Sequence, residues 1–202
     1  MARNAVSLGK FALTEEYGAA AVIERFAFND MTAREFALAF PYCLPGVGER
    51  TVNALFGEAA MRRFLWSNPD SFFTIGRNQR GALDQANTSL DAVIGVRVKQ
   101  ELRERWLNHG LTSIPLAWCG AWAGGVLSLL FVPAFLVAAW RAARRGEWLF
   151  LFYAAPAVAM LALHALVANH YTRYNLALIG PFAVGTAWLL ADRMVRAKAK
   201  PA

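Results

Sequence analysis

Long apolar segments without a charged side chain dominate the second half of this chain. Three of them, free of Lys, Arg, Asp and Glu, run from Leu111 to Trp140, from Trp148 to Thr172 and from Tyr174 to Ala191. The hydrocarbon core of a bilayer requires roughly 20 apolar residues of helix, whereas a core helix of a soluble protein seldom runs so far without a charge. We therefore predict three transmembrane helices within residues 111–202.

Residues 1–110 show a different pattern, in which short apolar faces with a helical period alternate with turn signals. One such face between Glu15 and Phe28 places Glu24 and Arg25 on the opposite, outward side of the predicted helix. Thr32 and Glu35 have the spacing of a capping box, so a second helix is expected to begin there.

Two later segments complete this half of the chain. The polar, glycine-bounded segment Gly76–Gly81 predicts an exposed loop. Apolar residues at every fourth position from Ser89 to His109 predict a longer helix, which Gly110 is placed to cap. Because no period-2 strand pattern occurs, we expect an all-α protein with a helical region of short helices at 1–110 and a three-helix transmembrane region at 111–202.

The cations that flank the apolar segments predict their orientation. Three arginines follow the first segment and four cations follow the third, whereas Arg173 is the single cation between the second and third. Since Lys and Arg gather on the cytoplasmic side of membrane helices, the C-terminus is expected in the cytoplasm. Three spans then place residues 1–110 outside the cytoplasm, together with the loop His170–Arg173.

The net charge of +7 does not indicate a nucleic-acid-binding protein. Residues 1–110 hold 13 of the 21 Lys and Arg residues and 12 of the 14 Asp and Glu residues, so this half is nearly neutral. The excess charge lies beside the apolar segments, where topology explains it. Nucleic acid is therefore not an expected partner, whereas membrane lipids are.

Cysteine and histidine are too sparse to suggest a metal or a cofactor. The sequence has Cys43, Cys119 and three histidines, without CxxC or another ligand spacing. Because Cys43 falls in the helical region and Cys119 in the first predicted span, a disulfide between them is not expected. We predict neither a metal site nor a bound cofactor.

Arg173 is the strongest candidate for a binding residue. It is expected at the extracytoplasmic mouth of the third span, with His170 and Tyr174 beside it. A guanidinium at that depth can bind a phosphate through two hydrogen bonds, which suits a polyprenyl-phosphate substrate. Alternatively, Arg173 contacts ordinary lipid headgroups inside an aromatic belt. His164, inside the second span, is expected to make a hydrogen-bonded packing contact rather than bind a ligand.

Two segments carry a resemblance to a known family. LTEEYGAAAVIERFAFNDMTAREFALAFPYCLPGVG (Leu13 to Gly48) resembles the extracytoplasmic segment of bacterial GT-C type integral membrane glycosyltransferases, the dolichyl-phosphate-mannose mannosyltransferase-like class. HYTRYNLALIGPF (His170 to Phe182) is similar to the Arg-Tyr element that opens a late span in those proteins. The resemblance implies transfer of a sugar from a polyprenyl-phosphate donor to an extracytoplasmic acceptor, in a bacterial inner membrane.

The same resemblance implies that part of the catalytic machinery lies outside this sequence. The family's catalytic carboxylate lies in the first extracytoplasmic loop, after the first of many spans, and that loop has no counterpart in this sequence. Only Arg173 and Tyr174 are carried over, as contacts to the donor phosphate, and we predict no catalytic residue. No signal peptide precedes residues 1–110, so we expect this to be the C-terminal portion of an enzyme that packs against further N-terminal spans and is inactive alone. A non-catalytic membrane-anchored interaction protein and a transporter subunit remain alternatives.

Overall fold

The computed structural model describes residues 17–85, 90–168 and 172–198. Within these ranges the side chains of residues 17–20, 84, 90–94, 102, 172–173 and 195–198 are not described. The described residues form helices and no strand, which confirms the all-α prediction. Three of these helices are long and apolar enough to cross a membrane.

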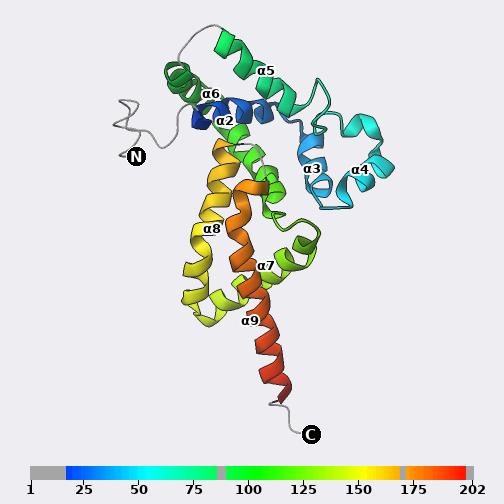
Figure 1. The fold of residues 1–202 in the computed structure, drawn as a ribbon, viewed down its shortest axis with the longest axis vertical. Helices are drawn as coiled ribbons and strands as arrows, with labels where there is room; N and C mark the ends of the chain where they lie inside the picture. The colour runs from blue at the N-terminus through cyan, green and yellow to red at the C-terminus, as the bar shows by residue number, and fades with distance from the viewer. Residues whose placement is uncertain (1–16, 86–89, 169–171, 199–202) are drawn as a thin grey trace.

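Short helices form the upper part of the molecule (Figure 1). In chain order they are α2 (Tyr17–Phe26), the 3-10 turn η1 (Ala27–Asp30), α3 (Ala33–Tyr42), α4 (Gly48–Phe56), η2 (Glu58–Ala60) and α5 (Phe72–Gln85). The predicted capping box at the start of α3 is confirmed, because the Thr32 hydroxyl accepts a hydrogen bond from the Glu35 backbone N–H while the Glu35 carboxylate accepts one from Thr32 N–H. Aromatic rings of η1, α5 and the turn that precedes α5 form the core of this part together with Leu38 and Ala39 of α3, and Phe28 is stacked on Phe72.

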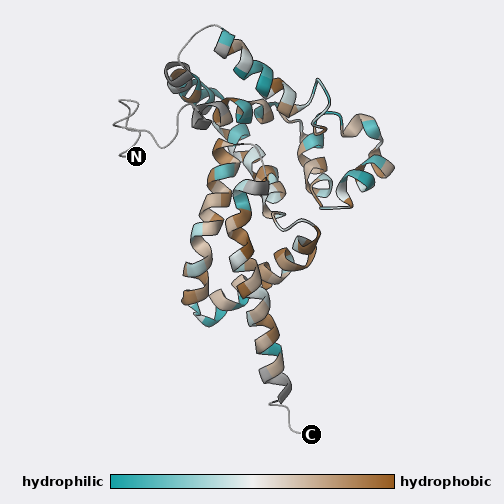
Figure 2. Ribbon diagram, viewed as in Figure 1, coloured by the Kyte–Doolittle hydropathy of each residue, from teal (hydrophilic) through white to brown (hydrophobic). Residues whose placement is uncertain are grey.

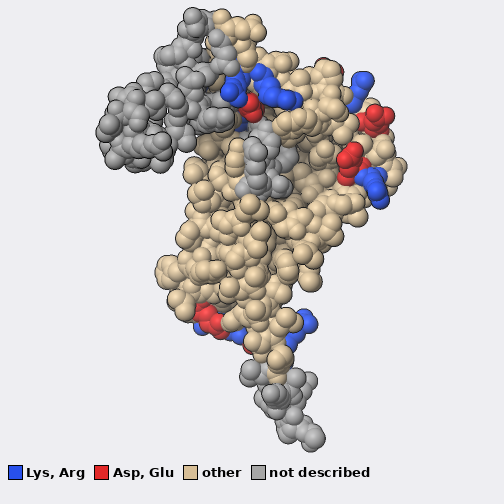
Figure 3. All heavy atoms as spheres, in the orientation of Figure 1, with Lys and Arg blue, Asp and Glu red and all other residues tan. Residues whose placement is uncertain are grey.

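The membrane candidates form the lower part. They extend over Gly125–Arg145, Trp148–Val167 and Tyr174–Met194. The corresponding elements are η3 (Gly125–Leu127) with α7 (Ser128–Arg145), α8 (Trp148–Val167), and the 3-10 segment η4 (Thr172–Leu178) with α9 (Ile179–Lys198). Figure 2 shows apolar residues concentrated along these helices, and Figure 3 shows charged atoms above and below an uncharged belt on the visible face. This distribution is the one that a lipid-embedded segment requires.

A long helical element, α6 (Leu90–Ala121), which is kinked at Arg105, connects the two parts and corrects two predictions. The helix continues through Gly110, so this glycine does not cap it, and it ends at Ala121, inside the first predicted span. Residues 111–121 therefore belong to the connecting helix, and the membrane candidate begins at Gly125. This part of α6 packs against the short helices, because Thr112 and Ser113 accept hydrogen bonds from Arg25 and Cys119 is bonded to Cys43. The division into domains at residue 110 stays a prediction, although α6 crosses it.

The predicted loop at Gly76–Gly81 is wrong, because both glycines lie inside α5. Gly76 serves a close contact between α5 and α2 and does not mark a loop. A Cβ built on Gly76 would lie 2.8 Å from the Cα of Glu24, closer than side chains pack, whereas one on Gly81 would meet open space. Glycine at position 76 thus allows two helix backbones to approach closely.

A disulfide joins Cys43 to Cys119, contrary to the expectation from the sequence. The expectation failed because it placed Cys119 inside a span, whereas α6 carries this residue alongside the end of α3. The same contact includes a hydrogen bond from the Trp118 indole N–H to the carbonyl oxygen of Phe40, at 2.8 Å. The disulfide closes a loop of 76 residues, so it fixes the short helices on the connecting helix.

Candidate functional site

The sequence-predicted site residues fall between α8 and α9. His170 lies outside the described residues, and Arg173 is described only by its backbone, within η4. Tyr174 is described fully, and its side chain is 39% exposed. Together with His164 and Asn175 it forms a cluster at the point where α8 ends and η4 begins, which we call the α8–α9 mouth.

His164 organises the described part of the α8–α9 mouth. Its Nδ1 lies 3.0 Å from Oδ1 of Asn175, within hydrogen-bonding distance, and its ring is tilted against that of Tyr174 with 5.4 Å between the ring centroids. The predicted hydrogen-bonded packing role of His164 is therefore confirmed. Because Asn175 is only 2% exposed, this contact fixes the backbone of η4 two residues after Arg173.

Helix α6 closes the other side of the mouth at Gly120. A Cβ at this position would lie 2.5 Å from Nδ2 of Asn175 and 2.9 Å from a methyl group of Leu161. Only a residue without a side chain leaves room for the Asn175 amide here. The segment that carries Arg173 and Tyr174 is thus packed between α6 and α8.

A buried arginine, which the sequence placed on an outward helix face, connects α2 to the same two helices. Arg25 is fully buried, and its Nε donates a hydrogen bond to the carbonyl oxygen of Ala165 at 2.8 Å. Its two terminal nitrogens donate to the Asn29 side chain and to three oxygens of α6, those of the His109 carbonyl and the Thr112 and Ser113 hydroxyls. Each nitrogen of the guanidinium therefore has a partner, as a buried charge requires. Burial nevertheless lowers the pKa of Arg25 to about 9, so the group stays charged at neutral pH.

His109 contributes a second buried titratable group to this network. Its Nε2 lies 2.9 Å from the carbonyl oxygen of Leu166, and its Nδ1 lies 3.1 Å from Oδ1 of Asn29. A neutral ring has one N–H and satisfies one of these oxygens, whereas a protonated ring satisfies both. Burial, and after it the positive charge of Arg25, disfavours the protonated ring more than the additional hydrogen bond favours it. The pKa of His109 is therefore lowered below its usual value.

The Arg25 network had one signal in the sequence. Thr112 and Ser113 are adjacent hydroxyl residues in an otherwise apolar segment, and buried hydroxyls need hydrogen-bond partners. Their partner could not be identified from the sequence, because it lies 87 and 88 residues away. We interpret the network as the structural connection that places the short helices over the α8–α9 mouth.

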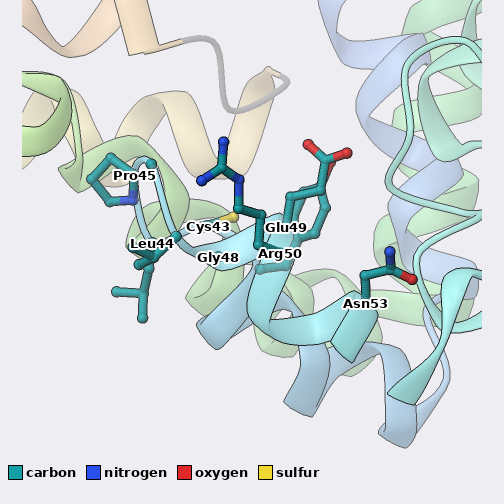
Figure 4. A pocket seen from close by; sticks show the side chains of 10 residues that line it. Cys43, Leu44, Pro45, Gly48, Glu49, Arg50 and Asn53 are labelled. Carbon is teal, nitrogen blue, oxygen red and sulfur yellow. The ribbon is translucent and has the colours of Figure 1, made fainter. Parts of the chain in front are cut away.

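A hollow of about 470 Å³ lies beside the disulfide (Figure 4). Its lining includes the turn from Cys43 to Gly48 and three polar residues of α4, namely Glu49, Arg50 and Asn53. Tyr42 also contributes, and its hydroxyl donates a hydrogen bond to the carbonyl oxygen of Phe64 at 3.3 Å. Burial, with a smaller contribution from the charge of Glu49, raises the pKa of Tyr42. The sequence does not indicate this hollow, because the turn and α4 are ordinary surface patterns when taken alone.

The described residues contain no group of three or more His, Cys, Asp or Glu side chains that could hold a metal ion. The carboxylates around the start of α3 have structural partners: Asp30 pairs with Arg105, and Glu35 takes part in the capping box and pairs with Arg63. Arginine and hydroxyl groups, rather than a set of ligands, thus provide the polar chemistry of this part of the chain. No family model matches the chain, and neither a curated protein nor a solved structure matches it.

Proposed function

We propose that this chain is the C-terminal portion of a membrane glycosyltransferase, and that the α8–α9 mouth binds the phosphate of a polyprenyl-phosphate sugar donor. The observation that carries the proposal is the packing of η4. Asn175 is buried between His164 and Gly120, which holds the Arg173–Tyr174 dipeptide at one end of two membrane candidates. A fixed backbone at that place can present a guanidinium to a lipid phosphate with little further loss of conformational entropy.

The disulfide supports the proposed side of the membrane. Disulfides persist in oxidising compartments such as the bacterial periplasm and are rare in the cytosol. The Cys43–Cys119 disulfide lies near the C-terminal end of α6, shortly before the first membrane candidate begins. The arginines of the opposite end, among them Arg141 and Arg145 around Asp192, are those expected in the cytoplasm. Both features favour residues 1–110 lying outside the cytoplasm, and the bacterial plasma membrane is the membrane that the resemblance implies.

In the proposed reaction this chain supplies the contact to the donor phosphate, and residues outside the sequence supply the catalytic base. In the transfer, the bond between the donor sugar's anomeric carbon and the phosphate oxygen breaks while an acceptor hydroxyl oxygen bonds to that carbon. The acceptor proton passes to a carboxylate base, which the resemblance assigns to an earlier extracytoplasmic loop, and the polyprenyl phosphate leaves. Arg173 stabilises the charge that grows on the departing phosphate, with His170 and Tyr174 as its neighbours in the binding site.

Binding of farnesyl phosphate, a short isoprenyl phosphate, to the detergent-solubilised chain tests the donor site. A hydrogen bond to a charged group contributes about 1.5–3 kcal/mol, so Arg173→Gln is expected to weaken binding by about ten- to a hundredfold. Arg144→Gln is the matched control, because Arg144 is an exposed arginine at the other end of the membrane candidates. Unchanged affinity in Arg173→Gln contradicts the proposal.

The alternatives predict other results in the same assay. A non-catalytic interaction protein or a transporter subunit has no reason to distinguish farnesyl phosphate from farnesol. We expect the wild-type chain to prefer the phosphate and to lose that preference in Arg173→Gln. Turnover of a polyprenyl-phosphate sugar by the purified chain alone contradicts the assignment of the base to residues outside it.

A further inference from the structure

We propose that the hollow beside the Cys43–Cys119 disulfide binds the saccharide part of the acceptor. This inference rests on the proposed function, since it names the acceptor site of the same reaction. Figure 4 shows the α4 side chains of Glu49, Arg50 and Asn53 around the hollow, whose opposite wall is the turn that contains Pro45.

The polar groups of the hollow match hydroxyl groups better than an ion. Glu49 and Arg50 bring opposite charges, so they attract neither an anion nor a cation strongly, while the Asn53 amide both donates and accepts hydrogen bonds. Asn53 lies four residues after Glu49 and three after Arg50, which places the three side chains on one face of the helix. All three are exposed, and within the described part of the chain none makes a hydrogen bond or ion pair through its side chain. A neutral ligand with several adjacent hydroxyls can use all three.

The wall of the hollow is held in shape by its own backbone. The N–H of Gly48 donates to the carbonyl oxygen of Leu44 at 2.8 Å, and a Cβ at Gly48 would lie 2.2 Å from the carbonyl oxygen of Tyr42. The disulfide fixes Cys43, the first residue of the turn, on α6. A preformed wall reduces the entropy lost when a small ligand binds.

The hollow and the α8–α9 mouth are both attached to α6, which supports the assignment of the hollow as the acceptor site. Cys119, which is bonded to the hollow's Cys43, directly precedes Gly120, which abuts Asn175 of the mouth. Two neighbouring residues of α6 therefore contact the two sites. In addition, a Cβ at Gly46 would lie 3.2 Å from a methyl group of Val126, in the first turn of a membrane candidate. A saccharide in the hollow would lie at the membrane surface, on the same side of the membrane as the α8–α9 mouth.

Saturation-transfer NMR on the full chain in detergent tests this inference with methyl hexopyranosides and methyl pentofuranosides as probes. We expect saturation of the ring protons of at least one glycoside, reduced at least fivefold in the double variant Glu49→Gln/Asn53→Ala. The control Glu58→Gln/Arg62→Gln alters exposed polar residues of the same region outside the hollow and should keep the signal. A Tm in detergent close to that of the wild-type chain shows that each variant is folded.

The outcomes separate the two proposals. Absence of saturation for every glycoside, or equal saturation in the hollow variant and its control, overturns the acceptor site and leaves the farnesyl phosphate result intact. Glycoside binding that depends on Glu49 and Asn53, in a chain that does not recognise farnesyl phosphate, supports a saccharide site and contradicts the proposed donor site.

Discussion

Arg25 donates a hydrogen bond from Nε to the carbonyl oxygen of Ala165, 140 residues away in the sequence, at 2.8 Å. Through this contact the first described helix is bound to the last turn of α8, directly before the segment that carries the predicted donor contacts. The guanidinium also binds α6, so a single buried charge holds three helices together. The shape of the candidate site thus depends on a residue that does not line it.

Replacing Arg25 should destabilise the chain strongly. Arg25→Met keeps much of the apolar volume but leaves the Ala165 carbonyl and the α6 hydroxyls without their donor, and such losses cost about 3–5 kcal/mol. Thermal unfolding in detergent should show a much lower Tm than for wild type. Arg34→Met, on the exposed side of α3, should change the Tm little. Equal Tm values for the two variants would contradict the role assigned to the network.

The disulfide gives a second prediction, which also reports the compartment. A chain isolated from its membrane without reductant should not react with a maleimide, and it should gain two labels after reduction. Replacing both cysteines with serine removes a cross-link over 76 residues, for which the loop-closure model gives about 4 kcal/mol of lost stability. Labelling of both thiols in the unreduced chain would place residues 1–110 in a reducing compartment and remove a support of the proposed function.

The buried position of His109 predicts a dependence of stability on pH. Because its pKa in the folded chain is lowered, the folded state stays unprotonated at a pH where the unfolded state already binds a proton. Stability should therefore fall as the pH drops below about 6.5, by up to about 1.4 kcal/mol per pH unit. His109→Gln should remove this dependence, whereas Asn108→Gln, at an exposed neighbour, should keep it. A rise in stability on acidification would show that protonation satisfies both oxygens at a net gain.

Two glycines of α6 provide a matched pair of substitutions. Gly120→Ala introduces a methyl group against the Asn175 amide, and such overpacking costs about 1–3 kcal/mol and should weaken binding of farnesyl phosphate. Gly110→Ala meets open space in the same helix and should stabilise the chain by up to about 1 kcal/mol. Tm values and farnesyl phosphate titrations of both variants test the contact. Equal effects of the two alanines would contradict the close approach of η4 to α6.

The sequence predicted the features that depend on neighbouring residues. Apolar length alone indicates a membrane span, and the second and third candidates begin at the predicted residues, Trp148 and Tyr174. The capping box at Thr32 and Glu35 is likewise a local signal, because both partners lie within one helical turn. The hydrogen-bonded role of His164 followed from the cost of an ionisable group inside an apolar helix.

Tertiary structure decided the features that depend on distant partners. Periodicity placed Arg25 outward, since no local rule reveals that Ala165 and two hydroxyls of α6 will surround it. The pairing of Cys43 with Cys119 required α6 to continue past residue 110 along α3, and the helical state of Gly76 required the close approach of α2. In each case a contact across many residues overrode the local preference, because burial and hydrogen bonding with distant groups contribute more free energy than the intrinsic tendencies of a short segment.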